Sequence, residues 1–66
     1  PLLSRIIAIA DAYDAMTQDR VYRKAITHEA ALEEIKKNAG TQFDPQIAML
    51  FIEVVSDEYI RKAAKP

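Results

Sequence analysis

Residues 2–17, LLSRIIAIADAYDAMT, decide the fold of this 66-residue chain. Apolar residues recur here every three or four positions and do not alternate at the period of a strand, which is the pattern of an amphipathic helix. The spacing predicts a helix from about Leu2 to Thr17. Its expected core-facing stripe consists of Leu3, Ile6, Ile7 and Ala10, with Asp14 on the same face.

A second helix is predicted from about His28 to Asn38. Thr27 precedes it as an N-cap, because a threonine hydroxyl can accept a hydrogen bond from the exposed amides of the first turn. Gly40 stands where a helix typically ends in a left-handed cap. The apolar stripe of this helix consists of Ala31, Leu32 and Ile35.

The third helix is predicted from about Pro45 to Ala63. Asp44 can cap it, and Pro45 fits the first helical position, where its missing N–H costs nothing. The helix is apolar over a wide arc, and such a helix in so short a chain needs more than one neighbour. The expected fold class is therefore all-α with three helices, joined by a polar and basic loop over residues 18–26 and a shorter connection.

The composition limits how the chain can be stabilised and what it can bind. A domain of this size is only marginally stable and usually needs disulfides, a metal or a partner chain. Cysteine is absent, and the single histidine, His28, is expected to be exposed in the first turn of its helix rather than a metal ligand. The net charge of −1 favours no nucleic acid polymer. No stretch is apolar enough for membrane insertion and no signal peptide is visible, so a cytoplasmic setting is expected.

Two carboxylates stand out on the first helix. Asp11 and Asp14 lie three positions apart and therefore share one side of it. A carboxylate on a buried face is costly unless it is paired, hydrogen-bonded or bound to metal. One interpretation is an acid that pairs with Arg20 or Arg23. The other is an oxygen ligand for a divalent metal, a role that suits carboxylates.

A basic segment, DRVYRK at residues 19–24, follows the end of the same helix. Arg20 and Arg23 carry planar guanidinium groups that match phosphate oxygens. The alternative is a solvated loop whose cations complement the negative end of the helix. Combined with a metal-capable carboxylate just before it, the segment favours metal-assisted phosphoester hydrolysis, in which a metal activates water and cations hold the phosphate.

Two stretches of the chain resemble HD-GYP domains, which belong to the HD superfamily of metal-dependent phosphohydrolases. Residues 4–17, SRIIAIADAYDAMT, followed by DRVYR at residues 19–23, resemble the last motif-bearing block of these domains. AGTQFDP at residues 39–45 resembles their closing motif. The resemblance runs from Pro1 to about Val55 and so covers nearly the whole chain.

The resemblance implies a helical domain that holds two or three metal ions, commonly iron or manganese, and cleaves cyclic di-GMP. On this resemblance Asp11 matches the terminal metal-ligand aspartate. Arg20 and Arg23 match basic positions that contact the substrate phosphate. Asp14 matches a recurrent acid that is structural or supports the ligands, and it is expected to pair with Arg20. Val21 stands where the family more often has proline, a difference that bears on loop rigidity.

The histidines, the His-Asp doublet and the Gly-Tyr-Pro motif of such domains lie upstream and do not occur in these residues. Residues 1–66 are therefore expected to be the C-terminal portion of a larger HD-type domain, inactive in isolation. No metal is expected on the chain alone, because a catalytic metal needs several protein ligands. In the larger protein the implied activity is that of a cyclic di-GMP phosphodiesterase with a divalent metal.

A different class of function remains as the alternative: a non-catalytic helical interaction or dimerisation module of a signalling protein. Under either interpretation the first and third helices present apolar faces. Such faces favour self-association as a homodimer or a larger assembly. Asp11 is expected to face solvent or a partner chain.

Overall fold

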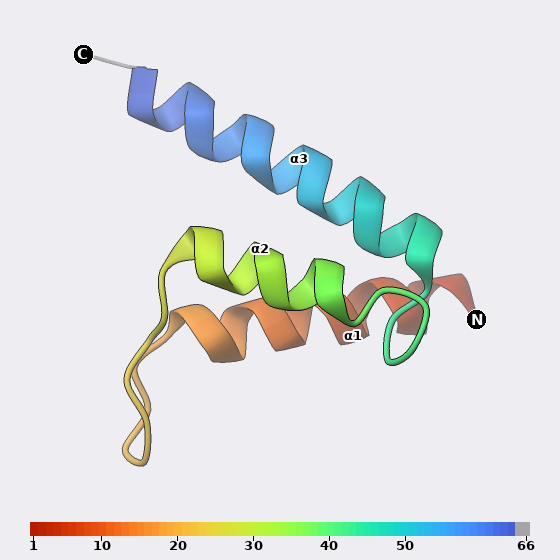
Figure 1. Ribbon diagram of the computed structural model, residues 1–66, viewed down its shortest axis with the longest axis horizontal. Helices are drawn as coiled ribbons and strands as arrows, with labels where there is room; N and C mark the ends of the chain where they lie inside the picture. Colours follow the sequence, from red (N-terminus) through yellow and green to blue (C-terminus); the bar gives the residue numbers. More distant parts are fainter. Residues whose placement is uncertain (65–66) are drawn as a thin grey trace.

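The computed structural model describes residues 1–64. Within that range the chain forms three helices: α1 spans Leu2–Thr17, α2 spans His28–Lys37 and α3 spans Pro45–Ala64. Figure 1 shows α2 turning back along α1, and α3 running back across them with its C-terminal half directed away from both. The predicted all-α fold is confirmed for the described residues, and every predicted helix end lies within one residue of the observed end.

A small apolar core lies where the three helices meet. Ile9 of α1, Ile35 of α2 and Ala48 of α3 are all 0% exposed. Fully burying one isoleucine side chain contributes about 1.5–3 kcal/mol, so the two isoleucines together contribute about 3–6 kcal/mol. The predicted stripe of α2 is confirmed, because all three of its residues are buried. The partly buried residues around this core are Tyr13, Met16, Ala39, Phe43, Ile47, Phe51, Ile52 and Val55.

Helix α1 turns a different side to the core from the one predicted. Ile9 is buried, and Tyr13 and Met16, four and seven positions later, pack against the same core. The predicted stripe of Leu3, Ile6, Ile7 and Ala10 is exposed, so that prediction was wrong for the described chain. The expectation that Asp14 lies on a buried face was also wrong, because its side chain is 63% exposed. Helix α1 is apolar on two sides, and both of its partners lie on the Ile9 side.

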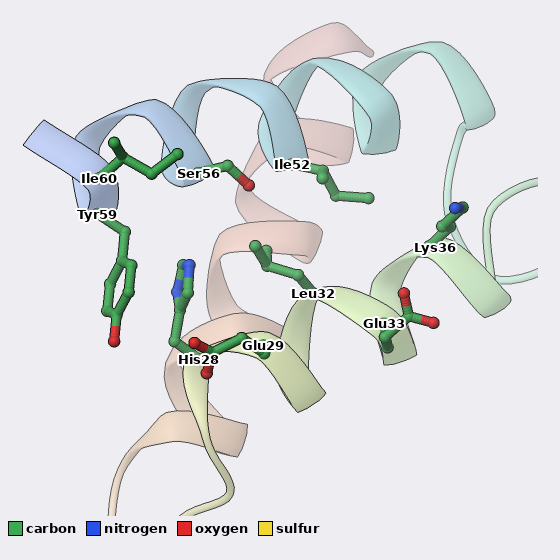
Figure 2. Close-up of a pocket in the computed structure, with 9 residues that line it drawn as sticks. All are labelled: His28, Glu29, Leu32, Glu33, Lys36, Ile52, Ser56, Tyr59 and Ile60. Atoms are coloured by element: carbon green, nitrogen blue, oxygen red, sulfur yellow. The ribbon is translucent and has the colours of Figure 1, made fainter.

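A groove of about 470 Å³ lies between α2 and the C-terminal half of α3. Figure 2 shows side chains of the two helices facing each other across it, with the rings of His28 and Tyr59 at one end. Leu32 and Ile52 line the apolar part of the groove. The groove exists because α3 diverges from α2 towards its C-terminal end.

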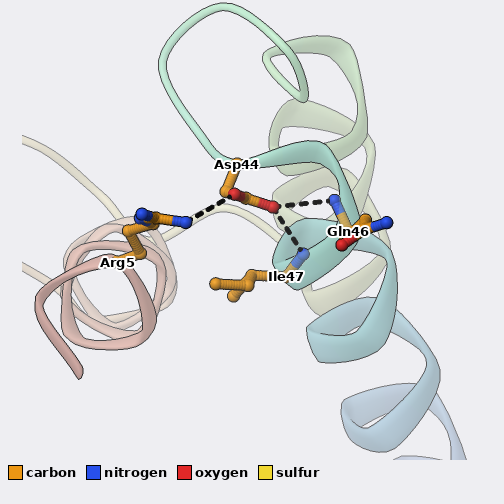
Figure 3. A network of polar contacts seen from close by, with 4 residues as sticks. All are labelled: Arg5, Asp44, Gln46 and Ile47. Carbon is orange, nitrogen blue, oxygen red and sulfur yellow. Dashed lines mark hydrogen bonds and ion pairs between the residues drawn. The ribbon is translucent and has the colours of Figure 1, made fainter. Parts of the chain in front are cut away.

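Asp44 joins the start of α3 to α1 (Figure 3). One carboxylate oxygen accepts hydrogen bonds from the backbone N–H groups of Gln46 (3.0 Å) and Ile47 (3.1 Å), which confirms the predicted cap. The other accepts from the guanidinium of Arg5 on α1 at 3.0 Å. The Ile47 amide first, then the Gln46 amide and the Arg5 guanidinium, hold the pKa of the Asp44 carboxyl below its ordinary value.

The turn between α2 and α3 depends on the one glycine of the chain. Gly40 has a φ of 90°, in the left-handed region, and its N–H donates to the carbonyl of Phe43 at 2.8 Å. A side chain at this position would be strained whatever space surrounds it. Gly40 is left-handed as predicted, but it lies two residues beyond Asn38, the C-cap of α2, whose φ is −98°, so it shapes the turn and does not cap the helix. The Asn38 carbonyl accepts from three later amides, those of Thr41, Gln42 and Phe43, and this closes the turn.

None of the helices that the structure describes has the length and apolar character needed to cross a membrane.

The lowered pKa of Asp44 predicts a pH-dependent contribution to stability. A carboxyl whose pKa is lower in the folded state stabilises the fold above its unfolded pKa, and the contribution is lost as the pH falls through the folded pKa. Asp44→Asn keeps a good capping residue but removes the charge. As the pH falls from about 6 to about 2, we expect the free energy of unfolding to decrease less in the variant than in the wild type.

Urea unfolding followed by circular dichroism over this pH range measures the difference. Asp57→Asn is the matched control, because Asp57 is an exposed acid on α3, the helix that Asp44 caps, and has no hydrogen bond or ion pair within residues 1–64. Equal pH dependence for Asp44→Asn and the wild type would show that the Asp44 contacts contribute nothing to stability.

Candidate functional site

Asp11 and Asp14 both lie on the exposed surface of α1, one turn apart. Asp14 is occupied by neighbours: its carboxylate lies 3.9 Å from the Arg20 guanidinium and accepts a hydrogen bond from the Gln18 amide at 3.3 Å. The expected pairing of Asp14 with Arg20 is therefore confirmed. Asp11 is exposed, as expected, and its carboxylate has no hydrogen bond or ion pair within the described part of the chain.

The segment after α1 is a tight hairpin and not an open loop. The Arg20 N–H donates to the Arg23 carbonyl at 2.8 Å, and the Arg23 N–H donates to the Arg20 carbonyl at 3.2 Å. Val21 and Tyr22 form the two-residue turn between them. Neither has a positive φ, which excludes the turn types I′, II′ and II and leaves type I as the natural class. Type I turns splay the strands of a hairpin, which fits a ladder that stops at one residue pair.

Hydrogen bonds anchor this hairpin to the C-terminal end of α1. The Arg23 guanidinium donates to the Ala15 carbonyl at 2.8 Å, and the Ile26 N–H donates to the Met16 carbonyl at 2.8 Å. Both acceptors are among the last carbonyls of the helix, which have no partner within it. The predicted alternative, in which basic residues complement the helix end, therefore has direct support for Arg23.

The hairpin also holds both arginines on one side. Residues that face each other in an antiparallel pair project from the same face, so Arg20 and Arg23 leave the backbone side by side. The carboxylate of Asp19 accepts a hydrogen bond from the Ala25 N–H at 2.8 Å, so this negatively charged side chain is bound to the backbone of the hairpin segment. The site therefore consists of two neighbouring cations beside Asp14, with the uncommitted carboxylate of Asp11 one helical turn away.

Metal ligands are few in this part of the molecule. The described residues hold no group of three or more His, Cys, Asp or Glu side chains that could bind an ion together. Asp11 suits one position in such a site, because it offers a hard carboxylate oxygen on an exposed helix face. Residues 1–64 could thus contribute a ligand to a metal site, but they do not form a complete metal site by themselves.

A second cluster, at the α2–α3 groove, was missed from the sequence. The Tyr13 hydroxyl and the His28 Nδ1 are 2.7 Å apart, and the His28 ring stacks on Tyr59 with centroids 4.1 Å apart. Tyr13 also meets Phe51 edge-on, with centroids 5.5 Å apart. Burial first, then the charges of Tyr59 and Glu29, raise the pKa of Tyr13. The expectation that His28 is exposed was wrong: it is half-buried between α1 and α3.

This aromatic cluster connects all three helices on the core side of α1, and Asp11 lies on the opposite, exposed side of that helix. No local sequence pattern predicts this cluster, since its residues come from three separate segments of the chain. A buried polar ring finds its hydrogen-bond partner only when those segments pack.

Comparison with known proteins identifies the family. A sequence profile of the HD domain matches residues 1–47, which is more than half of the chain. The chain belongs to the HD domain family. The family recognised from the sequence motifs is therefore confirmed, and divalent-metal dependence is general in HD phosphodiesterases.

Curated relatives of this HD chain are named as cyclic dinucleotide phosphodiesterases. A cyclic di-GMP phosphodiesterase of Vibrio cholerae is 38% identical over 97% of the chain, which corresponds to 13% of that protein. The cyclic di-GMP phosphodiesterase response regulator RpfG of Xanthomonas campestris is 44% identical over 70% of the chain and 12% of its own length. The 3′3′-cGAMP-specific phosphodiesterase 2 of Vibrio cholerae is 38% identical over 80% of the chain and 10% of its own length.

The HD chain thus spans about an eighth of the length of these relatives. No solved structure matches the chain significantly.

The type I turn of the hairpin makes a prediction about Val21. Proline is favoured at the first central position of such a turn, and the Val21 N–H donates to no acceptor within the described residues. We expect Val21→Pro to stabilise the chain by about 0.4–1 kcal/mol, because it reduces the freedom of the unfolded chain. Urea unfolding measures the change.

Tyr22→Pro is the matched control one residue later. Proline at the second central position disfavours the αR conformation of the residue before it, so this variant should be destabilised. The account of the turn would be wrong if both variants lost stability equally.

Proposed function

We propose that this HD chain is the C-terminal part of a metal-dependent phosphohydrolase that acts on a cyclic dinucleotide, with cyclic di-GMP as the substrate. The observation that carries the proposal is the contrast between neighbouring acids. Asp14 and Asp19 are committed to Arg20 and Ala25, whereas Asp11 is exposed and has no partner within residues 1–64. The Asp11 carboxylate is therefore open to a ligand, one helical turn from Asp14 and its partner Arg20.

Each residue of the site has a proposed role. Asp11 provides one carboxylate ligand of a divalent ion, iron or manganese, whose other ligands come from a longer protein. When bound, the ion would lower the pKa of a water molecule and polarise the phosphoester. Arg20 and Arg23 bind the phosphate oxygens, and their shared face lets two guanidinium groups meet one phosphodiester. Asp14 orients Arg20 through the 3.9 Å ion pair.

The names of the relatives support the substrate class, since both cyclic di-GMP and 3′3′-cGAMP phosphodiesterases are among them. Both substrates are cyclic dinucleotides with two phosphodiester groups, which is the chemistry that paired arginines recognise. We further propose a cytoplasmic location, where such signalling nucleotides are made and degraded.

The central test uses a full-length protein that contains this sequence. Asp11→Asn is expected to lower bound metal and to reduce cyclic di-GMP hydrolysis by on the order of 100-fold or more, because even residues behind the ligands cost 10- to 100-fold. Metal analysis and chromatography of the products measure both quantities. Asp57→Asn, an exposed acid on α3, is the matched control and should leave both unchanged. Full activity in Asp11→Asn would refute the assigned role.

A specific observation favours a second function, that of an interaction module. Large apolar side chains are exposed on two helices: Leu2, Leu3, Ile6 and Ile7 on α1, and Met49, Leu50 and Val54 on α3. Uncovered apolar patches of this kind mark contact surfaces. We propose that the isolated chain self-associates as a homodimer or a larger assembly through these faces.

Light scattering with size-exclusion chromatography checks this proposal. We expect a mass above the 7.4 kDa of one chain, and Leu3→Glu should shift the population towards that value. Ser4→Glu adds the same charge one residue later and serves as the control. A wild-type chain that is monomeric at high concentration would contradict self-association.

A further inference from the structure

The tip of the hairpin presents an aromatic side chain to solvent. Tyr22 is 84% exposed and its neighbour Val21 is 106% exposed. The other two tyrosines of the chain, Tyr13 and Tyr59, both contact rings from other helices. Tyr22 has no ring contact and no side-chain hydrogen bond within residues 1–64. The core therefore does not account for this aromatic residue.

The backbone under Tyr22 is held in place. The bonds of 2.8 and 3.2 Å between Arg20 and Arg23 close the turn directly beneath it. The Arg23 guanidinium and the Ile26 amide then fasten the turn to α1. An aromatic side chain on a fixed turn loses little conformational freedom when it binds, since tyrosine has only two side-chain torsions.

The immediate neighbours of Tyr22 define which ligands it can accept. Arg20 lies two positions before it, and Arg23 and Lys24 follow it, so the short turn that carries the phenol ring also carries three cationic residues. The guanidinium groups suit a phosphate, and the phenol ring suits a flat aromatic group. A nucleotide combines both features, because only the sugar separates its base from its phosphate. Stacking of a base on an aromatic side chain is worth about 1–3 kcal/mol.

We propose that Tyr22 is a stacking platform for one base of the nucleotide substrate, next to the phosphate held by Arg20 and Arg23. The inference rests on the proposed function and deepens it. Tyr22 acts on the affinity for substrate and on the preference among bases, and it takes no part in bond cleavage. Its loss therefore raises KM and leaves kcat nearly constant.

The first experiment uses the 66-residue chain and needs no metal and no turnover. In an NMR titration, GMP should shift the ring protons of Tyr22 upfield, because a stacked purine shields them. Ribose 5-phosphate, which carries the phosphate without the base, should move the signals of Arg20 and Arg23 without shielding the Tyr22 ring. Equal effects of the two ligands on the ring, or no effect of GMP, would overturn the proposal.

The second experiment measures cyclic di-GMP hydrolysis in the full-length protein. Tyr22→Leu removes the ring and should raise KM about 5- to 150-fold, which is the stacking energy converted at 1.36 kcal/mol per tenfold. Tyr22→Phe keeps the ring and should stay within about twofold of the wild type, since stacking needs only the π-face. Val21→Ala is the matched control at the neighbouring exposed position of the same turn and should change neither KM nor kcat.

The outcomes separate this inference from the proposed function. An active protein whose KM is unchanged in Tyr22→Leu would overturn the stacking role and leave the hydrolase proposal standing. A protein without hydrolysis would overturn the hydrolase proposal, while the GMP titration still decides whether the ring stacks on a base. A large loss of thermal stability in Tyr22→Leu would show that the ring packs against protein, which would also overturn the proposal.

Discussion

The attachment of the hairpin to the last carbonyls of α1 is the constraint on which the site depends. Helix ends leave carbonyl groups without partners, and here the Arg23 guanidinium and the Ile26 amide supply two of them. The same contacts that complete the helix fix the direction of a short basic segment. Without them, a run of cations after a helix would be free to separate in solvent. With them, Arg20 stays near the Asp14 carboxylate and Arg23 stays on the end of α1.

Helix α1 in turn needs the other two helices to hold its orientation. Ile9 buries against α2 and α3, the Tyr13 hydroxyl meets His28, and Arg5 pairs with the cap of α3. These three contacts are spaced along α1 and fix its rotation, which leaves Asp11 on the exposed side. The core is nevertheless small, and apolar side chains stay uncovered on α1 and α3. Leu3 and Ile7 of α1 lie on the same exposed face as Asp11, because these three residues follow one another at intervals of four positions.

Local sequence signals predicted the helix ends and the caps well. The start of α3 follows from Asp44-Pro45 and the left-handed residue in the preceding turn from Gly40, because both effects act over a few neighbouring residues. Local signals could not show which side of α1 is buried and which is exposed. That helix is apolar on two sides, and only the positions of its partners decide that Ile9 and not Ile7 is buried. His28 was placed in solvent for the same reason, since its partners come from α1 and α3.

In the candidate site too, contacts between residues close in sequence were predictable, and contacts that depend on the fold were not. The pairing of Asp14 with Arg20 was predictable, because the two residues are close in sequence and opposite in charge. The hairpin was not, since its turn lacks the glycine or asparagine that usually marks a two-residue connection. The contact of Arg23 with the end of α1 also needed the fold. It is this contact that turns a basic stretch of sequence into a pair of cations on one face.

Amide hydrogen exchange, measured residue by residue on the 66-residue chain, tests the anchored hairpin most directly. The account predicts that the amides of Arg20, Arg23 and Ile26 exchange more slowly than those of Val21 and Lys24, which donate to no acceptor within residues 1–64. It also predicts that Arg23→Gln accelerates exchange at Ile26. Exchange of Arg20, Arg23 and Ile26 at the rates of an unstructured peptide would contradict the account.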